Sequence, residues 1–238
     1  YTAAAVRDFL DRIGVAKADS VVDTAMLEHC IREDLNLHAP RNMAVLDPVK
    51  VVIDNWPEGK FEELTVENHP NDPSLGTHTV RMGSEVYIER EDFSIDPPKK
   101  FFRLKPEGEV RLKGAYIIKC TGWEAKDDGT VTVIHCDYDP DSKSGEDARK
   151  VKGTLHWVNA VDAVDAEFRL YEPLILDADA EDDRDFTERL NPDSITTKRG
   201  VVEPVLGATA PGDRFQFMRV GYFCTDPDTA PTLPVFNR

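Results

Sequence analysis

The spacing of apolar residues changes at about residue 40, and this change constrains the fold more than any other feature of the sequence. Before it, apolar side chains recur every three or four residues, which predicts two amphipathic helices. The first is capped by Thr2 and stops at Gly14, and the second begins near Ser20 and ends before Pro40. After it, short β-branched and aromatic runs are separated by Pro, Gly and Asn, which predicts strands.

The clearest β unit is a hairpin around Asp128 and Gly129. Apolar alternation runs through 115–123 and 130–138 on either side, and Asp-Gly is a preferred sequence for a tight hairpin turn. A helical start followed by many such strands favours barrels or a sandwich over a parallel sheet. Further strands are predicted at 43–46, 49–53, 86–88, 154–158, 167–170, 201–205 and 214–224.

The sequence excludes several classes of protein. No apolar run approaches the roughly 20 residues that a membrane-spanning helix needs, so no membrane partner is expected. The four cysteines lack the spacing of zinc ligands and are expected to be reduced and buried. No nucleophile elbow, phosphate-binding loop or zinc-protease motif is present, so the sequence offers no catalytic centre. Because a helix follows directly on Tyr1, we expect a piece of a longer protein.

One basic segment interrupts an acidic chain. The formal charge is -16, yet residues 99–113 (KKFFRLKPEGEVRLK) carry six basic side chains and two acidic ones. A positive groove with aromatic rings is what binding of single-stranded nucleic acid requires. The alternative is an exposed basic hairpin whose aromatic rings face the core. The acidic stretches 141–148 and 177–185 favour another alternative, a small acidic enzyme or an acidic protein-interaction module that docks through them.

Several stretches, in order along the whole chain, resemble the C-terminal half of bacterial glutaminyl-tRNA synthetases. They are IREDLNLHAPRNMAVLDPVKVVI at 31–53, ENHPNDP at 67–73, EVRLKGAYIIK at 109–119, RKVKGTLHWV at 149–158, FQFMRVGYFC at 215–224 and PVFNR at 234–238. The resemblance implies a mainly β fold of two antiparallel, ribosomal protein L25-like β-barrels after a small α-helical subdomain. It implies these divisions: a helical subdomain at 1–40, first strands of a proximal barrel at 41–74, a distal barrel at 75–155, and return strands completing the proximal barrel at 156–238.

The resemblance also implies a function. The chain is expected to bind the anticodon stem-loop of tRNA(Gln) for glutamine-tRNA ligation by an N-terminal catalytic domain that lies upstream. On this basis the chain alone is inactive and has no cofactor, while ATP and Mg belong to the full-length enzyme. The expected partners are the tRNA and the catalytic domain, without DNA, and the expected location is the cytoplasm. A related alternative is the barrel domain of a glutamyl-tRNA synthetase.

The resemblance assigns side chains to the middle and third anticodon bases. Arg41, Gln216 and Arg219 match positions around the middle base, where Gln and Arg can satisfy the acceptors and the donor of a uracil. Arg103 matches the reader of the third base, whose guanine offers two acceptors to a guanidinium. Phe102 stands where a lysine is expected, and it is either a stacking ring or part of the core.

Five further positions are carried over from the resemblance. Arg111 and Lys113 match positions near the first anticodon base and its phosphate, and Lys100 stands where a glutamine is common. Lys113 replaces an expected arginine, so contacts to the first base are expected to be more electrostatic and less selective. Asn36 and Asn71 match asparagines near the pairs that extend the anticodon stem.

Overall fold

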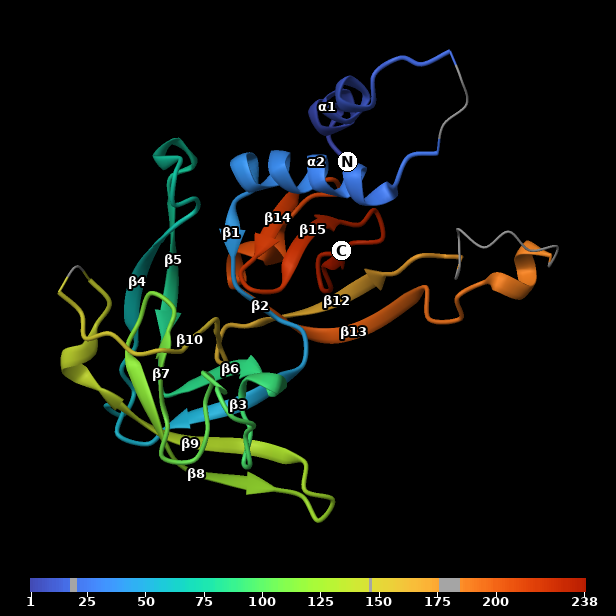
Figure 1. The fold of residues 1–238 in the computed structure, drawn as a ribbon. Coiled ribbons are helices and arrows are strands. Elements are labelled where there is room, and N and C mark those ends of the chain that lie inside the picture. Colours follow the sequence, from blue (N-terminus) through green and yellow to red (C-terminus); the bar gives the residue numbers. More distant parts are fainter. Residues whose placement is uncertain (18–20, 146, 176–184) are drawn as a thin grey trace.

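A computed structural model describes residues 1–17, 21–145, 147–175 and 185–238. Within these ranges the fold is mainly β, with two α-helices at the N-terminal end (Figure 1). The helices are α1 (Ala3–Ile13) and α2 (Thr24–His38). The strands are β1 (Arg41–Asn42), β2 (Ala44–Val45), β3 (Pro48–Ile53), β4 (Glu62–Glu67), β5 (Thr77–Met82), β6 (Glu85–Glu89), β7 (Glu109–Leu112), β8 (Ile117–Ala125), β9 (Val131–Asp139), β10 (Thr154–Leu155), β11 (Val158–Asn159), β12 (Val164–Tyr171), β13 (Ile195–Val202), β14 (Arg214–Phe217), β15 (Gly221–Thr225) and β16 (Val235–Asn237).

The helix boundaries follow the capping rules. Thr2 Oγ1 accepts the Ala5 N–H at 3.0 Å, and Gly14 ends α1 with a φ of 68°, as the sequence predicts. The cap of α2 is Asp23, so this helix begins later than the predicted start near Ser20, a residue outside the described ranges. Neither helix of the described ranges is long and apolar enough to cross a membrane.

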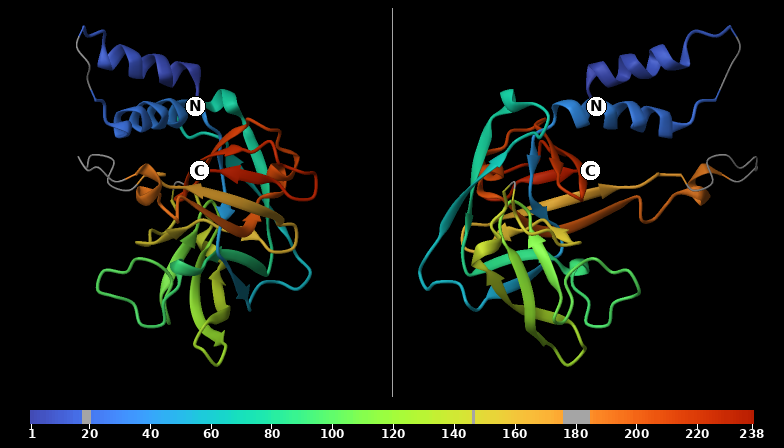
Figure 2. Two further views of the ribbon diagram at one scale, coloured as in Figure 1. Left: turned by 90° about the vertical axis from the view of Figure 1, so that its right-hand side faces the viewer. Right: turned by 60° about the vertical axis from the view of Figure 1, so that its left-hand side comes forward.

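Two seven-stranded sheets and a ribbon make up the β part. The strand orders are β1-β14-β15-β16-β12-β13-β2 in the first sheet and β10-β7-β8-β9-β3-β6-β11 in the second. Most pairs are antiparallel, but β1–β14, β12–β16, β10–β7 and β3–β9 are parallel, so both sheets are mixed. Strands β4 and β5 form a separate ribbon whose tip rises to α2, whereas the β12–β13 hairpin extends outwards (Figures 1 and 2).

The hairpin around Asp128 and Gly129 is confirmed. Strands β8 and β9 pair from Ile117 opposite Asp139 to Ala125 opposite Val131, and Gly129 takes a φ of 83° in the turn. This long hairpin forms part of the second sheet, at the end far from the helices (Figure 1).

Two predicted strands are interrupted, and one ends early. The segment 214–224 is a hairpin, β14 and β15, because Arg219 takes a φ of 66° in the turn between them. The segment 154–158 breaks at His156 into β10 and β11. Strand β13 ends at Val202 because Pro204 begins a 3-10 turn. Both interruptions contribute residues to the cavities described below.

Each sheet has its own apolar core. In the first, Phe168 packs edge-on against Phe217 with ring centroids 6.0 Å apart, and both rings are fully buried. The core of the second sheet includes Trp157, whose Nε1 donates to the Lys113 carbonyl at 2.9 Å. All four cysteines are free thiols; Cys30, Cys120 and Cys136 are buried as predicted, but Cys224 is only half-buried.

Candidate nucleic-acid interface

A cavity of 290 Å³, which we call the arginine cavity, is lined by residues from both sheets. Its lining consists of Arg41, Lys113, Thr154, Leu155, His156, Gln216, Met218 and Arg219. Arg41 and Gln216 stand opposite each other in the parallel pair of β1 and β14, and Arg219 follows in the β14–β15 turn. The structure therefore brings together the three residues that the resemblance assigns to the middle base, and adds Lys113 to them.

Three residues that line the arginine cavity have a buried side-chain atom that forms no hydrogen bond within the described part of the chain. The atoms are Nε of Arg41, a donor, Oε1 of Gln216, an acceptor, and Nε2 of His156, whose nearest partner is the Glu89 carboxylate at 3.5 Å. The Arg41 guanidinium is held in place by its Nη2, which donates to Oδ1 of Asn36 at 3.1 Å. Because buried polar groups in folded proteins are normally paired, this site fits a ligand edge that offers both an acceptor and a donor.

A buried carboxylate holds Arg219. Nη1 and Nη2 of Arg219 donate to Oδ2 and Oδ1 of Asp92, each at 2.7 Å, and Asp92 is fully buried. This two-pronged arrangement fixes the guanidinium plane, and the hydrogen bond with Asp92 raises the pKa of Arg219. Sequence reasoning missed Asp92, which lies in the charged run EREDF at 89–93, directly after the strand residues VYI.

Glu89 supports the same side of the cavity through His156. Nδ1 of His156 accepts from Arg219 Nη1 at 3.3 Å, and Nε2 faces the Glu89 carboxylate at 3.5 Å. Burial raises the pKa of Glu89, but hydrogen bonds from His156 and from the backbone N–H groups of Leu46 and Asp47 outweigh it and hold the pKa below its ordinary value. The guanidinium of Arg219 is thus placed by two buried acids.

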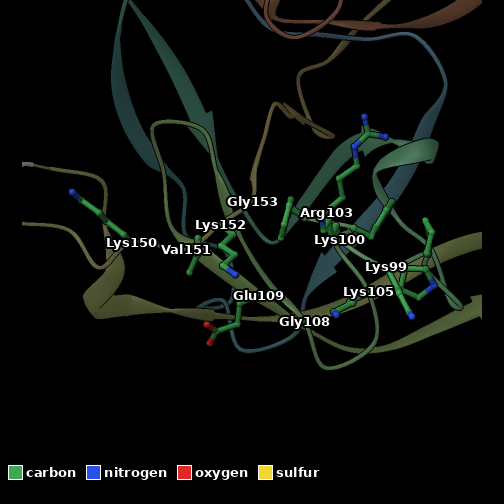
Figure 3. Close-up of a pocket in the computed structure, with 14 residues that line it drawn as sticks. Lys99, Lys100, Arg103, Lys105, Gly108, Glu109, Lys150, Val151, Lys152 and Gly153 are labelled. Carbon is green, nitrogen blue, oxygen red and sulfur yellow. The ribbon is translucent and has the colours of Figure 1, made fainter.

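A second cavity of 640 Å³, the lysine cavity, lies along the predicted basic segment (Figure 3). Five lysines line it, none of which forms an ion pair with another described residue: Lys99, Lys100, Lys105, Lys150 and Lys152. Uncompensated cations around a cleft attract phosphate. Sequence reasoning missed Lys150 and Lys152, although the basic run RKVK at 149–152 was a signal.

A close backbone approach builds the lysine cavity. A Cβ atom on Gly153 would lie 2.2 Å from the carbonyl oxygen of Phe102, so only glycine lets these two segments meet. Phe102 is 52% exposed, so it is not a core residue. Lys152 Nζ lies 5.4 Å from the ring centroid, within the range of a cation–π interaction.

Arg103 lines the lysine cavity but is turned away from its amines. Figure 3 shows the guanidinium pointing away from Lys105 and Lys152. Its Nε lies 3.2 Å from Oδ1 of Asp92, and its Nη1 lies 3.3 Å from the Glu91 carboxylate. The same buried aspartate therefore contacts an arginine of each cavity.

Arg111 is used inside the protein. Nη1 donates to the carbonyl oxygens of Ser142 at 2.7 Å and Ala115 at 3.1 Å, and Nη2 donates to that of Arg149 at 2.6 Å. Burial lowers the pKa of Arg111. Arg111 lines neither cavity, so the structure separates it from Lys113, with which the resemblance groups it.

Asn36 and Asn71 meet through a histidine that the sequence reasoning did not single out. His69 is buried; its Nε2 donates to the Asn36 carbonyl at 2.9 Å, and its Nδ1 accepts the Asn71 N–H at 3.2 Å. Oδ1 of Asn36 also accepts from Arg41 and, at 3.3 Å, from the Tyr222 hydroxyl. The two asparagines thus lie beside the arginine cavity, where the ribbon tip meets α2.

The sequence is similar to known proteins along its whole length. Residues 39–139 and 154–226 match two family models, both described as the anti-codon binding domain of class I tRNA synthetases (E and Q). A relative named glutamine--tRNA ligase from Clostridium perfringens is 54% identical over 242 residues, covering 100% of this chain and 44% of its own length. Relatives of the same name from Nitrobacter hamburgensis and Alteromonas mediterranea are 52% and 48% identical, covering 99% and 100% of this chain and 42% and 43% of their own lengths. The chain therefore spans less than half the length of these curated relatives.

Proposed function

We propose that this chain, which belongs to the family of anticodon-binding domains of class I tRNA synthetases for glutamate and glutamine, binds the anticodon stem-loop of a glutamine tRNA. The observation that carries this proposal is the arginine cavity, where a buried donor on Arg41 and a buried acceptor on Gln216 form no hydrogen bond with any described residue. The edge of a uracil carries acceptors and a donor, so a flipped middle base satisfies both atoms.

The other nucleotides are distributed over the neighbouring residues. We assign the third base to Arg103, and the first base and its phosphate to Lys100 and Lys113. Arg111, whose guanidinium donates to backbone carbonyls, supports these residues from inside the protein. Asn36 and Asn71 are assigned to the end of the stem. The five lysines of the lysine cavity supply attraction for phosphates, and the arginines supply selection among bases.

The remaining parts of the proposal concern the complete protein. We propose that the first sheet belongs to a proximal barrel and most of the second sheet to a distal barrel. Strands β3 and β11 pair within the second sheet although they lie in the ranges 41–74 and 156–238 of the proximal barrel. We also propose that an upstream catalytic domain carries out glutamine-tRNA ligation with ATP and Mg in the cytoplasm. Exposed apolar side chains on the helices, Leu10 at 54% and Met26 at 41%, support a partner domain there. No group of three or more side chains suited to a metal ion occurs in the described ranges.

The test is binding of the chain to an anticodon stem-loop, measured by fluorescence anisotropy across a salt series. We expect tighter binding of the glutamine loop than of a loop with a changed middle base, with affinity falling as salt rises. A glutamate anticodon keeps the middle uracil and changes the third base, so preference for that loop favours the glutamyl alternative. No binding to any loop by the folded chain contradicts the proposal.

Arg103→Ala separates base reading from general attraction. We expect a loss of about 1 to 3 kcal/mol for the glutamine loop and a smaller loss for loops with a changed third base, because a guanidinium pairs with two guanine acceptors. Equal losses for all loops would show that Arg103 does not read a base.

A further inference from the structure

One buried carboxylate contacts an arginine from each cavity. Oδ1 of Asp92 accepts from Arg219 Nη2 at 2.7 Å and lies 3.2 Å from Arg103 Nε, while Oδ2 accepts from Arg219 Nη1. The backbone carbonyl of Asp92 also accepts the N–H of Leu104 at 2.9 Å, which ties down the segment that carries Arg103. Arg219 belongs to the turn after β14 in the first sheet, so Asp92 links parts of the molecule that are far apart in sequence.

The shared oxygen makes the two arginines interdependent. Asp92 is 0% exposed, so the two arginines take the place of water around its carboxylate, and a buried carboxylate needs its cationic partners. Each guanidinium still has a donor nitrogen that forms no hydrogen bond with a described residue: Nη2 in Arg103 and Nε in Arg219. The two side chains are 38% and 34% exposed. A ligand that pulls on one arginine therefore changes how firmly Asp92 holds the other.

We infer that Asp92 is a positioning residue that couples the two cavities, so that two anticodon bases are read as a unit instead of independently. The inference rests on the proposed function and adds a specific regulation to it. Asp92 itself lines neither cavity. Its effect on binding runs through the orientation of Arg103 and Arg219.

The test is a cycle of four stem-loops: the glutamine loop, one with the middle base changed, one with the third base changed, and one with both changed. Coupling in the unaltered chain predicts that the loop with both bases changed loses less affinity than the product of the two single losses, by a factor of about 5 to 10. Groups that interact show such non-additive effects in these cycles. In Asp92→Asn, discrimination at both positions falls and the single changes become multiplicative.

Glu167→Gln is the matched control, because Glu167 also binds two arginines with one carboxylate. Arg169 Nε donates to it at 2.9 Å and Arg199 Nη2 lies 2.8 Å from it, and its side chain is 13% exposed. Glu167 lines neither cavity. This variant keeps the discrimination and the coupling of the unaltered chain.

Arg103→Gln keeps the inference testable if Asp92→Asn does not fold. Arg103 is a partly exposed side chain and does not line the arginine cavity. Coupling predicts that discrimination at the middle base nevertheless falls about 3- to 5-fold in this variant. The inference is overturned if the affinity losses of the unaltered chain multiply and Arg103→Gln keeps its discrimination at the middle base. The proposed function still stands in that case. An unaltered chain that does not discriminate at all overturns the proposed function.

Discussion

The arginine cavity and the lysine cavity differ in how their cations are held. In the first, two hydrogen bonds to Asp92 fix the guanidinium plane of Arg219, and one hydrogen bond to Asn36 holds Arg41, before any ligand arrives. In the second, five ammonium groups have no ion pair among the described residues. Fixed planar donors select among base edges, whereas flexible point charges attract any phosphate. One surface of the protein thus has separate groups for selecting a base and for attracting phosphate.

The backbone is more regular beneath the arginine cavity than beneath the lysine cavity. The arginine cavity stands on a paired strand, β14, and its tight turn. The lysine cavity is formed mostly by irregular segments at 97–105 and 150–153 that meet at Gly153, together with Gly108 and Glu109 at the start of β7. Selection of the middle base therefore rests on hydrogen-bonded strands, whereas the lysines and Arg103 lie on irregular segments.

Gly153→Ala breaks the lysine cavity and has the largest expected effect. The added methyl would lie 2.2 Å from the Phe102 oxygen and 3.0 Å from Val110 Cγ1, so the backbone must move. We expect a loss of about 1 to 3 kcal/mol in the free energy of unfolding, measured with urea. Gly145→Ala, whose methyl meets open space, is the control and leaves stability nearly unchanged. Equal effects of the two variants would contradict this packing.

Gln216→Leu tests selection in the arginine cavity. Removing Oε1 deletes the buried acceptor that has no partner in the described structure, so the folded chain loses no hydrogen bond through that atom. We expect discrimination against a changed middle base to fall by about 1 to 3 kcal/mol, and the dependence of binding on salt to stay the same. If the salt dependence changed and the discrimination stayed intact, Gln216 would contact a phosphate and not a base edge.

Local rules predict much of this fold, because the atoms that decide them are close in sequence. Thr2 and Gly14 bound a helix, and Asp128 with Gly129 turns a hairpin, through hydrogen bonds and φ values within a few residues. The turn at Arg219 was missed because a non-glycine residue takes a positive φ there. Its φ depends on packing that the local sequence does not encode.

In the candidate site, too, some residues could be predicted from the sequence and others depend on contacts between distant segments. The resemblance assigns Arg41, Gln216 and Arg219 to one nucleotide, and the structure brings them into one cavity. Asp92 and His69 could not be predicted, because each contacts a residue far away in the sequence. Asp92 binds Arg219, 127 residues away, and His69 binds Asn36, 33 residues away. Buried polar links of this length depend on how the sheets pair, which periodicity does not specify.

Phe102→Ala tests whether the lysine cavity also stacks a base. Stacking of a base on an aromatic ring contributes about 1 to 3 kcal/mol, and the partly covered ring of Phe102 places the expected loss near the lower end. Phe102→Trp should retain binding. Phe61→Ala is the matched control, because Phe61 is 43% exposed and has Arg81 at 4.4 Å from its ring centroid, but lies outside the lysine cavity. Equal losses from both alanine variants would exclude a specific stacking role.

Lys150→Ala and Lys152→Ala test attraction alone. Each should weaken binding of all loops by the same factor and reduce the slope of log affinity against log salt by about 1, because one phosphate contact is lost. Anisotropy with the glutamine loop and the middle-base variant across salt provides the measurement. Unequal losses for the two loops would mean that the lysines also select, and the contrast between the cavities would fail.

Acid provides the smallest and most specific test, because Glu89 contacts a lining residue of the arginine cavity, His156, and lines neither cavity itself. The pKa of Glu89 in the folded chain lies below its ordinary value of 4.5, so its ionised form stabilises the fold above pH 4.5. This contribution is lost as the pH falls through the lowered pKa. In urea titrations, Glu89→Gln should therefore be less stable than the unaltered chain at pH 7, and the gap should narrow as the pH falls below 4.5. Glu85→Gln, which removes a half-exposed pair with Lys50, should follow the unaltered chain closely at every pH. A constant gap for Glu89→Gln would mean that this buried acid does not act through its charge.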